Sequence, residues 1–180
     1  MTGRFIAVVG PSGVGKDSLM EALCQRHPGM LRARRVITRA PEAGGEDYEA
    51  VSPALFAARA AGGDFALHWR AHDLHYAIPN SVKDALRSGR DVLANLSRGV
   101  LVRADKVFDD LRVLHVTARP EVLAKRLRDR GRESRAEITR RLARPAPVLP
   151  EGLNIIEIDN SGSLDKAVQK ACAALYPVNA

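Results

Sequence analysis

The chain contains little cysteine, few aromatic residues and no long apolar run. Of its 180 residues, 2 are cysteine and 4% are aromatic. Two cysteines are too few for a disulfide framework or for a structural zinc site of their own. No apolar run approaches the roughly 18 residues that a membrane-spanning helix needs, and Met1–Gly10 is too short for a secretory signal. We therefore expect a cytoplasmic protein with no membrane partner, in which Cys24 and Cys172 are reduced and buried.

The rest of the composition is that of an ordinary globular protein. Hydrophobic residues make up 46% of the chain and charged residues 27%, which excludes collagen-like and disordered chains. A chain of this length buries a core without disulfide or metal staples. We therefore expect one domain over residues 1–180.

Positive charge is concentrated in one segment. Lysine and arginine number 28 and acidic residues 21, so the formal net charge is +7. Between Arg119 and Arg144 there are ten basic and four acidic residues, which is most of the excess. Arginine suits phosphate oxygens because its planar guanidinium donates two parallel hydrogen bonds; a solvated helix face is an equally good interpretation of the spacing alone. No aromatic residue lies there to stack on bases, so we expect no nucleic-acid partner.

Hydrophobic patterns predict alternating strands and helices. Short β-branched runs predict strands, and i, i+3, i+4 spacing behind a capping residue predicts helices. The predicted strands lie at about 5–9, 35–38, 65–69, 75–78, 91–95, 112–116 and 155–158. The predicted helices lie at about 17–27, 53–62, 80–89, 120–131, after the capping pair Ser134 and Glu137, and at 164–175. The alternation predicts an α/β protein with a mostly parallel sheet flanked by helices on both faces.

A phosphate-binding loop follows the first predicted strand and opens the first predicted helix. The segment reads G-x-x-x-x-G-K, in which backbone N–H groups surround phosphate oxygens and the lysine neutralises the β- and γ-phosphates. We therefore expect a bound nucleoside triphosphate. The residues concerned are Gly10, Pro11, Ser12, Gly13, Val14, Gly15 and Lys16, followed by Asp17 and Ser18.

Asp17 departs from the motif. A serine or threonine holds Mg²⁺ at this position in such loops, and a carboxylate is also a good ligand for a hard cation. Asp17 is therefore a candidate Mg²⁺ ligand, either directly or through water. The alternative, that it only interacts with the positive end of the helix dipole, is equally compatible with the sequence.

With the loop placed, the chain resembles the guanylate kinase family over about Phe5 to Leu175. The resemblance implies a P-loop kinase fold with a parallel-sheet core, an acceptor-binding region at about 35–97 and an arginine-rich lid at about 126–144. The matching pieces outside the loop are Thr38-Arg39, Glu46-Asp47-Tyr48, Val51-Ser52, Phe56, Phe65, Trp69, Tyr76, Arg126-Leu127, Arg130-Gly131 and Arg141-Leu142.

Residues that read the purine in that family are absent. The base-contacting serine is Arg35, the base-reading acid is replaced at His68, and the stretch with the hydroxyl that touches guanine is Tyr76–Ile78. Arg39 and Tyr48, which hold the acceptor phosphate in the family, remain. A site built to hydrogen-bond a purine does not tolerate losing all its polar partners.

A second phosphate-binding arginine of the family is replaced by Glu42. Together these departures resemble a branch of the family that phosphorylates a sugar bisphosphate during phosphonate utilisation. The pieces shared with that branch include Lys16–Leu19, Asn95, Ser97-Arg98, Arg130–Glu133 and Gly162–Leu164.

The resemblance to this branch implies transfer of the ATP γ-phosphate to the 1-phosphate of ribose 1,5-bisphosphate, which yields phosphoribosyl diphosphate. It implies ATP and Mg²⁺ as donor and metal, a sugar bisphosphate as partner, and an adenine contact at Asn160. The implied acceptor ligands are Arg35, Arg39, Tyr48, His68, Tyr76, Ser97 and Arg98. The implied catalytic residues are Lys16, Arg126, Arg130, Arg132 and Arg141.

Other functions stay open at this point. The nearest alternative is a nucleoside monophosphate kinase, such as a guanylate kinase; a non-catalytic phosphopeptide-binding module is another. We expect no zinc at His68, His72 and His75, because Gly62-Gly63 and Pro79 favour strands and turns there rather than a helix. The sequence is compatible with a homodimer and does not decide the oligomeric state.

Overall fold

The core of the protein is a five-stranded parallel sheet. The computed structural model describes residues 2–41, 46–131, 134–143 and 148–177. The strand order is β2-β7-β1-β8-β9, and every described pairing within it is parallel. The strands are β1 (Phe5–Val9), β2 (Leu31–Arg32), β7 (Val92–Asn95), β8 (Leu111–Thr117) and β9 (Ile155–Asp159). The predicted α/β class and mostly parallel sheet are confirmed.

Strand β1 lies in the middle of this sheet and is buried on both faces. All five of its residues have an exposed fraction of 0%. Ile6 and Val8 belong to one apolar cluster, whereas Phe5, Ala7 and Val9 belong to another. Because successive residues of a strand point to opposite faces, an uninterrupted apolar run is what a strand covered on both faces requires.

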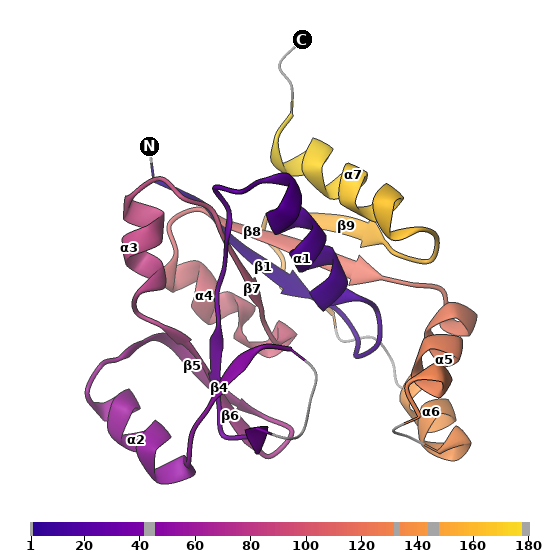
Figure 1. The fold of residues 1–180 in the computed structure, drawn as a ribbon, viewed down its shortest axis with the longest axis horizontal. Helices are drawn as coiled ribbons and strands as arrows, with labels where there is room; N and C mark the ends of the chain where they lie inside the picture. The colour runs from indigo at the N-terminus through magenta and orange to yellow at the C-terminus, as the bar shows by residue number, and fades with distance from the viewer. Residues whose placement is uncertain (1, 42–45, 132–133, 144–147, 178–180) are drawn as a thin grey trace.

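Helices cover both faces of the central sheet (Figure 1). Apolar residues of α1 and α7 pack on one face, and those of α3 and α4 pack on the other. Phe108, which follows α4, stacks on Phe5 with ring centroids 3.7 Å apart. The bounds are α1 (Lys16–Arg26), α3 (Val82–Arg87), α4 (Leu101–Val107) and α7 (Leu164–Leu175).

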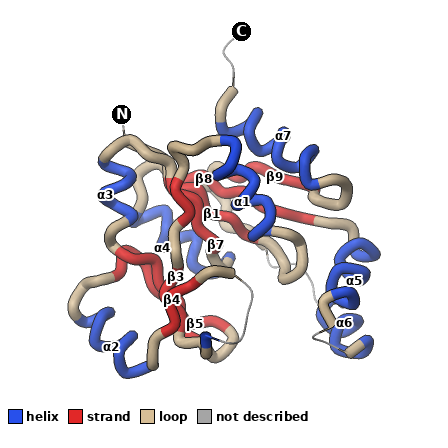
Figure 2. The backbone as a smooth tube through the Cα atoms, viewed as in Figure 1, coloured by secondary structure: helices blue, strands red, loops and turns tan. Residues whose placement is uncertain are grey.

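A smaller mixed sheet lies within the predicted acceptor-binding region (Figure 2). Its order is β4-β3-β6-β5, with β3 parallel to β4 and the other pairs antiparallel. Phe56 of α2 packs on it and contacts Phe65 at a centroid distance of 4.9 Å. As predicted, Ser52 caps α2: its hydroxyl accepts the N–H of Leu55 at 3.2 Å. The bounds are β3 (Arg35–Ile37), β4 (Tyr48–Ala50), α2 (Pro53–Ala61), β5 (Phe65–Ala71) and β6 (Leu74–Pro79).

Helices α5 (Pro120–Asp129) and α6 (Arg135–Leu142) form a pair on the opposite side of the molecule from α2 (Figure 1). The predicted capping pair is present at the start of α6. The Ser134 N–H donates to Glu137 Oε2 at 2.7 Å, and the Glu137 N–H donates to Ser134 Oγ at 3.3 Å. The two arginine-bearing helices are thus separate elements joined by a short connection.

The structure differs from the sequence prediction in three elements and in the cysteines. Strands β2 and β4 have two and three residues, too few to show a period. Helix α4 was also missed, although Leu101, Ala104 and Phe108 have helical spacing. Both cysteines are free and half-buried, so the prediction that they are buried is wrong. They lie at the margin of the cluster between α1 and α7 rather than inside it.

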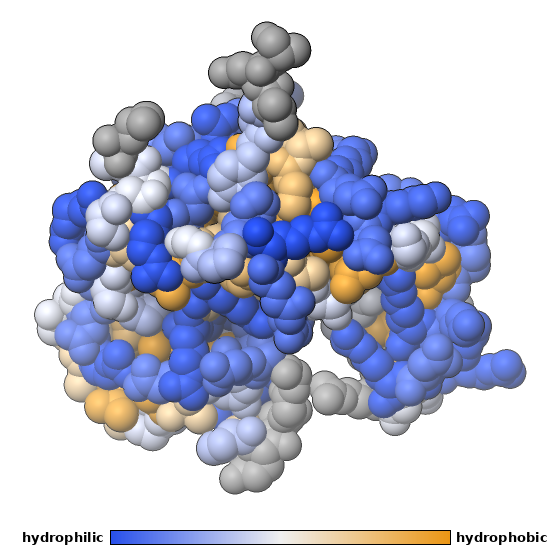
Figure 3. Space-filling model, turned by 45° about the horizontal axis from the view of Figure 1, so that its top comes forward, coloured by the Kyte–Doolittle hydropathy of each residue, from blue (hydrophilic) through white to orange (hydrophobic). Residues whose placement is uncertain are grey.

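The surface is mainly hydrophilic on the face that Figure 3 shows. Large apolar side chains that are exposed include Leu55, Val102, Val148 and Leu164. Within the part of the chain that the structure describes, no helix has both the length and the apolar character needed to cross a membrane.

Candidate active site

The phosphate loop joins β1 to α1, and two of its glycines are required by its shape. Gly13 has φ +87° and Gly15 has φ +97°, a region that L side chains rarely adopt. A Cβ on Gly15 would lie 2.5 Å from Asn160 Nδ2, and one on Gly13 would lie 2.8 Å from a methyl group of Leu127. The loop therefore packs closely against the segment after β9 and against α5, which leaves no room for side chains.

The carbonyl of Val14 is the point at which other elements hold the loop. Asn160 Nδ2 donates to it at 2.8 Å and Arg126 Nη1 donates to it at 3.2 Å. Asn160 is 3% exposed, and its Oδ1 is buried without a hydrogen-bond partner in the part of the chain that the structure describes. Both residues were predicted to belong to the site, and the structure brings both against the loop backbone.

Lys16 begins α1 and folds back over the loop. Its ammonium donates to the carbonyls of Gly10 at 2.8 Å and Pro11 at 3.1 Å. Burial lowers the pKa of Lys16 to about 8, because a charged amine is disfavoured away from water. A phosphate oxygen in the loop would replace the carbonyls as its partner.

The charges of four other side chains also act on the pKa of Lys16. The two carboxylates raise the pKa and the two guanidinium groups lower it. They belong to Asp17, Arg35, Glu46 and Arg98. These residues come from the first turn of α1, from β3, from the segment before β4 and from the turn after β7, so the fold gathers distant parts of the sequence at the phosphate loop.

Asp17, the candidate metal ligand, is in an ion pair. Its Oδ1 lies 2.7 Å from Arg32 Nη2, which reaches it from the end of β2. The two side chains are 47% and 28% exposed, so both remain open to exchange of partners. Arg32 was not among the predicted site residues, because a two-residue strand leaves no pattern that would place it.

Arg35 is buried and paired with Glu46. Its Nε donates to Glu46 Oε2 at 3.0 Å, and its Nη2 donates to the other carboxylate oxygen. The guanidinium also lies 5.0 Å from the ring centroid of Tyr76. Because the carboxylate occupies one edge of the guanidinium, Arg35 does not present that edge to a phosphate.

One wall of the site begins at Arg35 and continues through Tyr76, Trp69 and Ser97. The rings of Trp69 and Tyr76 stack with centroids 5.5 Å apart, and Trp69 Nε1 donates to Ser97 Oγ at 2.9 Å. Tyr76 and Ser97 were predicted; Trp69, interpreted from sequence as a core residue, is 7% exposed and supports the wall from inside.

Arg98 follows Ser97 and lacks a partner for one nitrogen. Its Nε is buried and has no hydrogen-bond partner among the described residues. Burial also lowers the pKa of the Arg98 guanidinium. A buried donor without a partner costs free energy.

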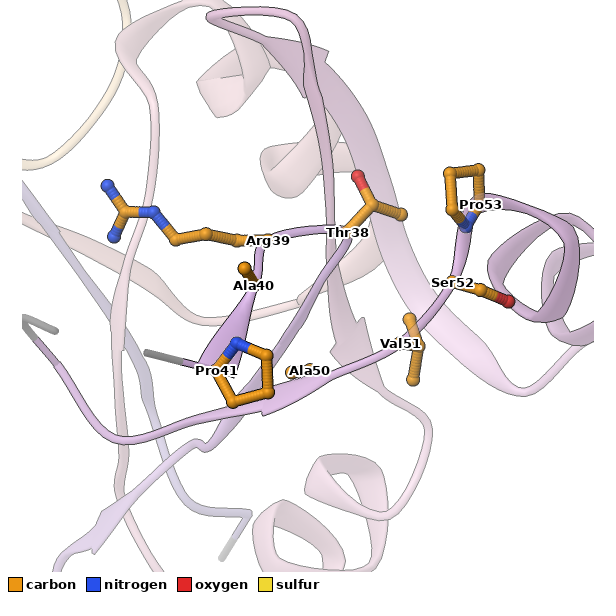
Figure 4. Close-up of a pocket in the computed structure, with 8 residues that line it drawn as sticks. All are labelled: Thr38, Arg39, Ala40, Pro41, Ala50, Val51, Ser52 and Pro53. Carbon is orange, nitrogen blue, oxygen red and sulfur yellow. The ribbon is translucent and has the colours of Figure 1, made fainter. Parts of the chain in front are cut away.

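Arg39 lines a surface pocket of about 360 Å³ within the predicted acceptor-binding region, and its guanidinium lies near Tyr48. The Tyr48 hydroxyl donates to the Ala40 carbonyl at 2.5 Å, and the Arg39 guanidinium lies 6.0 Å from the Tyr48 ring centroid. Figure 4 shows Arg39 extending away from Ser52 and Pro53 on the other wall. The pocket is lined by Thr38, Arg39, Ala40, Pro41, Ala50, Val51, Ser52 and Pro53.

His68 is not brought into the site. It alternates with Leu67 and Trp69 along β5, so it points to the opposite face of the small sheet. There its ring lies 6.3 Å from Phe56 and 6.4 Å from Phe65. The predicted contact of His68 with the acceptor therefore has no support in this geometry.

The other predicted residues are placed less closely. Ser12 and Ser18 are exposed beside the loop, and Arg130 is exposed at the end of α5. Arg141 lies in α6, but its side chain is outside what the structure describes. Arg132 and Glu42 lie outside the described residues altogether.

Comparison with known proteins agrees with this geometry. Residues 5–144 match the model of the AAA domain family. A guanylate kinase from Anaplasma phagocytophilum superposes with a TM-score of 0.66 at 18% identity, covering 97% of this chain and 85% of that one. A gluconokinase from Sinorhizobium meliloti 1021 gives a TM-score of 0.57 at 19% identity, covering 97% and 91%. Fold, loop and family match together define a P-loop kinase.

Two sequence relatives narrow the class. A ribose 1,5-bisphosphate phosphokinase PhnN from Ruegeria sp. (strain TM1040) is 58% identical over 174 residues, 96% of this chain and 92% of that protein. A protein of the same name from Rhizobium etli (strain CIAT 652) is 47% identical over 176 residues, 96% and 89% of the two chains. The chain belongs to the ribose 1,5-bisphosphate phosphokinase family. Kinases of this P-loop class use ATP, typically with Mg²⁺.

Proposed function

We propose that the protein transfers the γ-phosphate of ATP to the 1-phosphate of ribose 1,5-bisphosphate, giving 5-phospho-α-D-ribose 1-diphosphate and ADP. The observation that carries the proposal is the 58% identity, over 96% of the chain, to a relative named for this activity. The Arg98 guanidinium, whose charge acts on Lys16, supports it, because it adds a cation that suits a second phosphate group.

The donor side of the site is the loop from Gly10 to Lys16. Its backbone N–H groups and the Lys16 ammonium would hold the β- and γ-phosphates. Asn160 and Arg126 keep the loop in shape through the Val14 carbonyl.

The residues present fit Mg²⁺ in the way that kinases use it. Mg²⁺ keeps several waters and takes one or two carboxylates together with substrate phosphates, so Asp17 suffices as its protein ligand. Arg32 holds the Asp17 carboxylate 2.7 Å away and would orient it. When bound, the ion neutralises charge on the β- and γ-phosphates.

The acceptor side combines Arg98 near Lys16 with Arg39 at the pocket and Tyr48 near it. Two separate basic groups suit an acceptor with two phosphates and no base. Arg35, Tyr76 and Ser97 form the wall between them. From the lid, Arg130, Arg132 and Arg141 would stabilise charge on the transferring group.

The chemical step needs no general base. An oxygen of the 1-phosphate is already ionised at neutral pH; it bonds to the γ-phosphorus while the bond from that phosphorus to the β,γ-bridging oxygen breaks, and ADP leaves. Positioning and charge stabilisation carry the rate in such transfers. The chain supplies both through Lys16 and the arginines.

An ADP-release assay across acceptors tests the proposal. With ATP and Mg²⁺, we expect ribose 1,5-bisphosphate to be turned over with a kcat/KM far above those of GMP and ribose 5-phosphate. The Lys16→Ala variant serves as the blank and is expected to show no turnover. GMP turnover above that of the sugar bisphosphate would reverse the assignment in favour of a nucleoside monophosphate kinase.

A further inference from the structure

A second carboxylate, that of Glu46, is paired with Arg35 against the rings of Tyr76 and Trp69, on the side of the site that we propose holds an anionic acceptor. Glu46 and Asp17 are the carboxylates whose charges act on Lys16. Asp17 sits in the first turn of α1, where a helix dipole and a metal account for it. Glu46 precedes β4 and has neither explanation, and a free carboxylate there would repel a phosphate.

The structure holds Glu46 in place from one side. Both of its oxygens accept hydrogen bonds from Arg35, and the side chains of the two residues are 10% and 8% exposed. Arg35 in turn lies against the stacked rings of Tyr76 and Trp69. Trp69 Nε1 donates a hydrogen bond to Ser97, the residue before Arg98. The Glu46 carboxylate and the Arg98 guanidinium therefore belong to one connected wall.

The pairing leaves Glu46 able to accept more hydrogen bonds. An ionised carboxylate has about four lone-pair positions, and Arg35 fills two of them. The ion pair is by itself weak evidence of stabilisation, because removing both charges from water offsets much of their attraction. What the remaining lone pairs can bind is a neutral donor, and the sugar between two phosphates supplies hydroxyl groups.

We propose that Glu46 accepts a hydrogen bond from a ring hydroxyl of the acceptor pentose, and that Arg35 positions Glu46 for it. In this arrangement Arg98 binds a phosphate group of the acceptor and Glu46 binds its sugar. This inference rests on the proposed function, because it assigns Glu46 to the same acceptor. It makes Glu46 a specificity residue, and it makes Arg35 a positioning residue rather than a phosphate ligand.

The experiment compares ribose 1,5-bisphosphate with its 2-deoxy and 3-deoxy analogues as acceptors. For the wild-type enzyme, we expect at least one analogue to lose about 10-fold to 100-fold in kcat/KM, the usual effect of losing a hydrogen bond to a charged group. The quantity compared is the ratio of kcat/KM for ribose 1,5-bisphosphate to kcat/KM for the deoxy analogue. The double variant Arg35→Met/Glu46→Leu removes the Glu46 carboxylate and leaves no charge unpaired, so we expect this ratio to fall to within about twofold of one. Asp47→Asn, an exposed acid next in sequence, is the matched control and keeps the wild-type ratio.

The ratio is measured within one enzyme preparation, so it does not depend on the folded fraction. If the double variant does not fold, Glu46→Gln decides, with an expected fall of the ratio by at least about threefold. A variant that slows all acceptors equally shows a structural role and overturns the inference, as does a wild-type enzyme indifferent to both missing hydroxyls. Failure of the wild type to use ribose 1,5-bisphosphate instead contradicts the proposed function itself.

Discussion

At the scale of single residues, the protonation of Lys16 depends on pH near neutrality. Burial lowers the pKa of its amine to about 8, against 10.5 for a free lysine. A bound triphosphate would restore a higher pKa, because it places negative charge beside the ammonium. Below about pH 8 the amine is charged with or without ATP; above it, the free enzyme loses a proton that binding must return.

We therefore predict proton uptake when ATP binds above neutrality. At pH 8, titration calorimetry with Mg²⁺-saturated ATP in buffers of different ionisation enthalpy should show uptake of roughly half a proton per ATP. From about pH 8 towards 10.5, ATP affinity should fall by up to about tenfold per pH unit. The same titration at pH 6.5 is the control, with little uptake. Equal heats in all buffers at pH 8 would show that Lys16 is not the titrating contact.

For the replacement of Arg98 we predict opposite effects on activity, which should fall, and on stability, which should rise. Arg98→Met should lower kcat/KM for the sugar bisphosphate by roughly 100-fold to 1000-fold, since the acceptor loses a charged partner. It should also raise the free energy of unfolding by about 1 kcal/mol, because the buried Nε no longer lacks a partner. Acceptor kinetics and urea denaturation measure the two effects. Arg103→Met, on the exposed side of α4, is the control; equal losses in both variants would argue against the assigned contact.

Some of the site could be predicted residue by residue, and some could not. The loop glycines and Lys16 are recognisable because the spacing of the loop motif fixes their place, whereas Arg98 and Arg126 are assigned through the resemblance to the guanylate kinase family. The sequence gives Arg32 no place in the site and gives Glu46 a family match without a role, because only the tertiary fold creates their contacts with Asp17 and Arg35.

His68 shows a different kind of error at the same scale. The alternation of β5 puts Leu67 and Trp69 inward and His68 outward. The alternation of apolar and polar residues in the sequence indicates this outward position of His68, whereas its place in the family motif indicates a contact with the acceptor. A one-residue change in register exchanges the two faces of a strand, so position in a motif does not by itself place a side chain in a pocket.

At the scale of elements, the phosphate loop depends on the segment after β9. Asn160→Ala removes the shorter of two hydrogen bonds to the Val14 carbonyl. We predict a rise in the KM for ATP of about tenfold and a loss of about 1–2 kcal/mol in unfolding free energy, with the KM for the acceptor changed much less. Asn154→Ala, exposed just before β9, should change none of these. An unaltered KM for ATP in the Asn160 variant would remove the loop-holding role.

Long elements were predictable and short ones were not. The helices α1, α2 and α7 have helical spacing, and the strand β1 is an uninterrupted apolar run. The predicted caps of α2 by Ser52 and of α6 by Ser134 are present. Strands β2 and β4 form only because neighbours pair with them. These two strands carry or border Arg32, Glu46 and Tyr48. The sequence prediction of the acceptor side was therefore less complete than that of the donor side.

At the scale of the whole molecule, the net charge of +7 favours approach of anionic substrates. Both the donor and the proposed acceptor are anions. We predict that kcat/KM for ATP falls by roughly threefold to tenfold between about 0.02 M and about 0.2 M salt, while kcat changes much less. Arg128→Glu, at an exposed position of α5, should flatten this dependence. A kcat/KM independent of salt would show that the charge serves another purpose.

The most direct test of the account is competition between two acceptors in one tube, followed by ³¹P NMR. Equimolar ribose 1,5-bisphosphate and GMP are mixed with ATP, Mg²⁺ and the wild-type protein. We predict that diphosphate signals of phosphoribosyl diphosphate grow in step with ADP while GMP stays unchanged. Conversion of GMP to GDP with the sugar bisphosphate left intact would contradict the central claim.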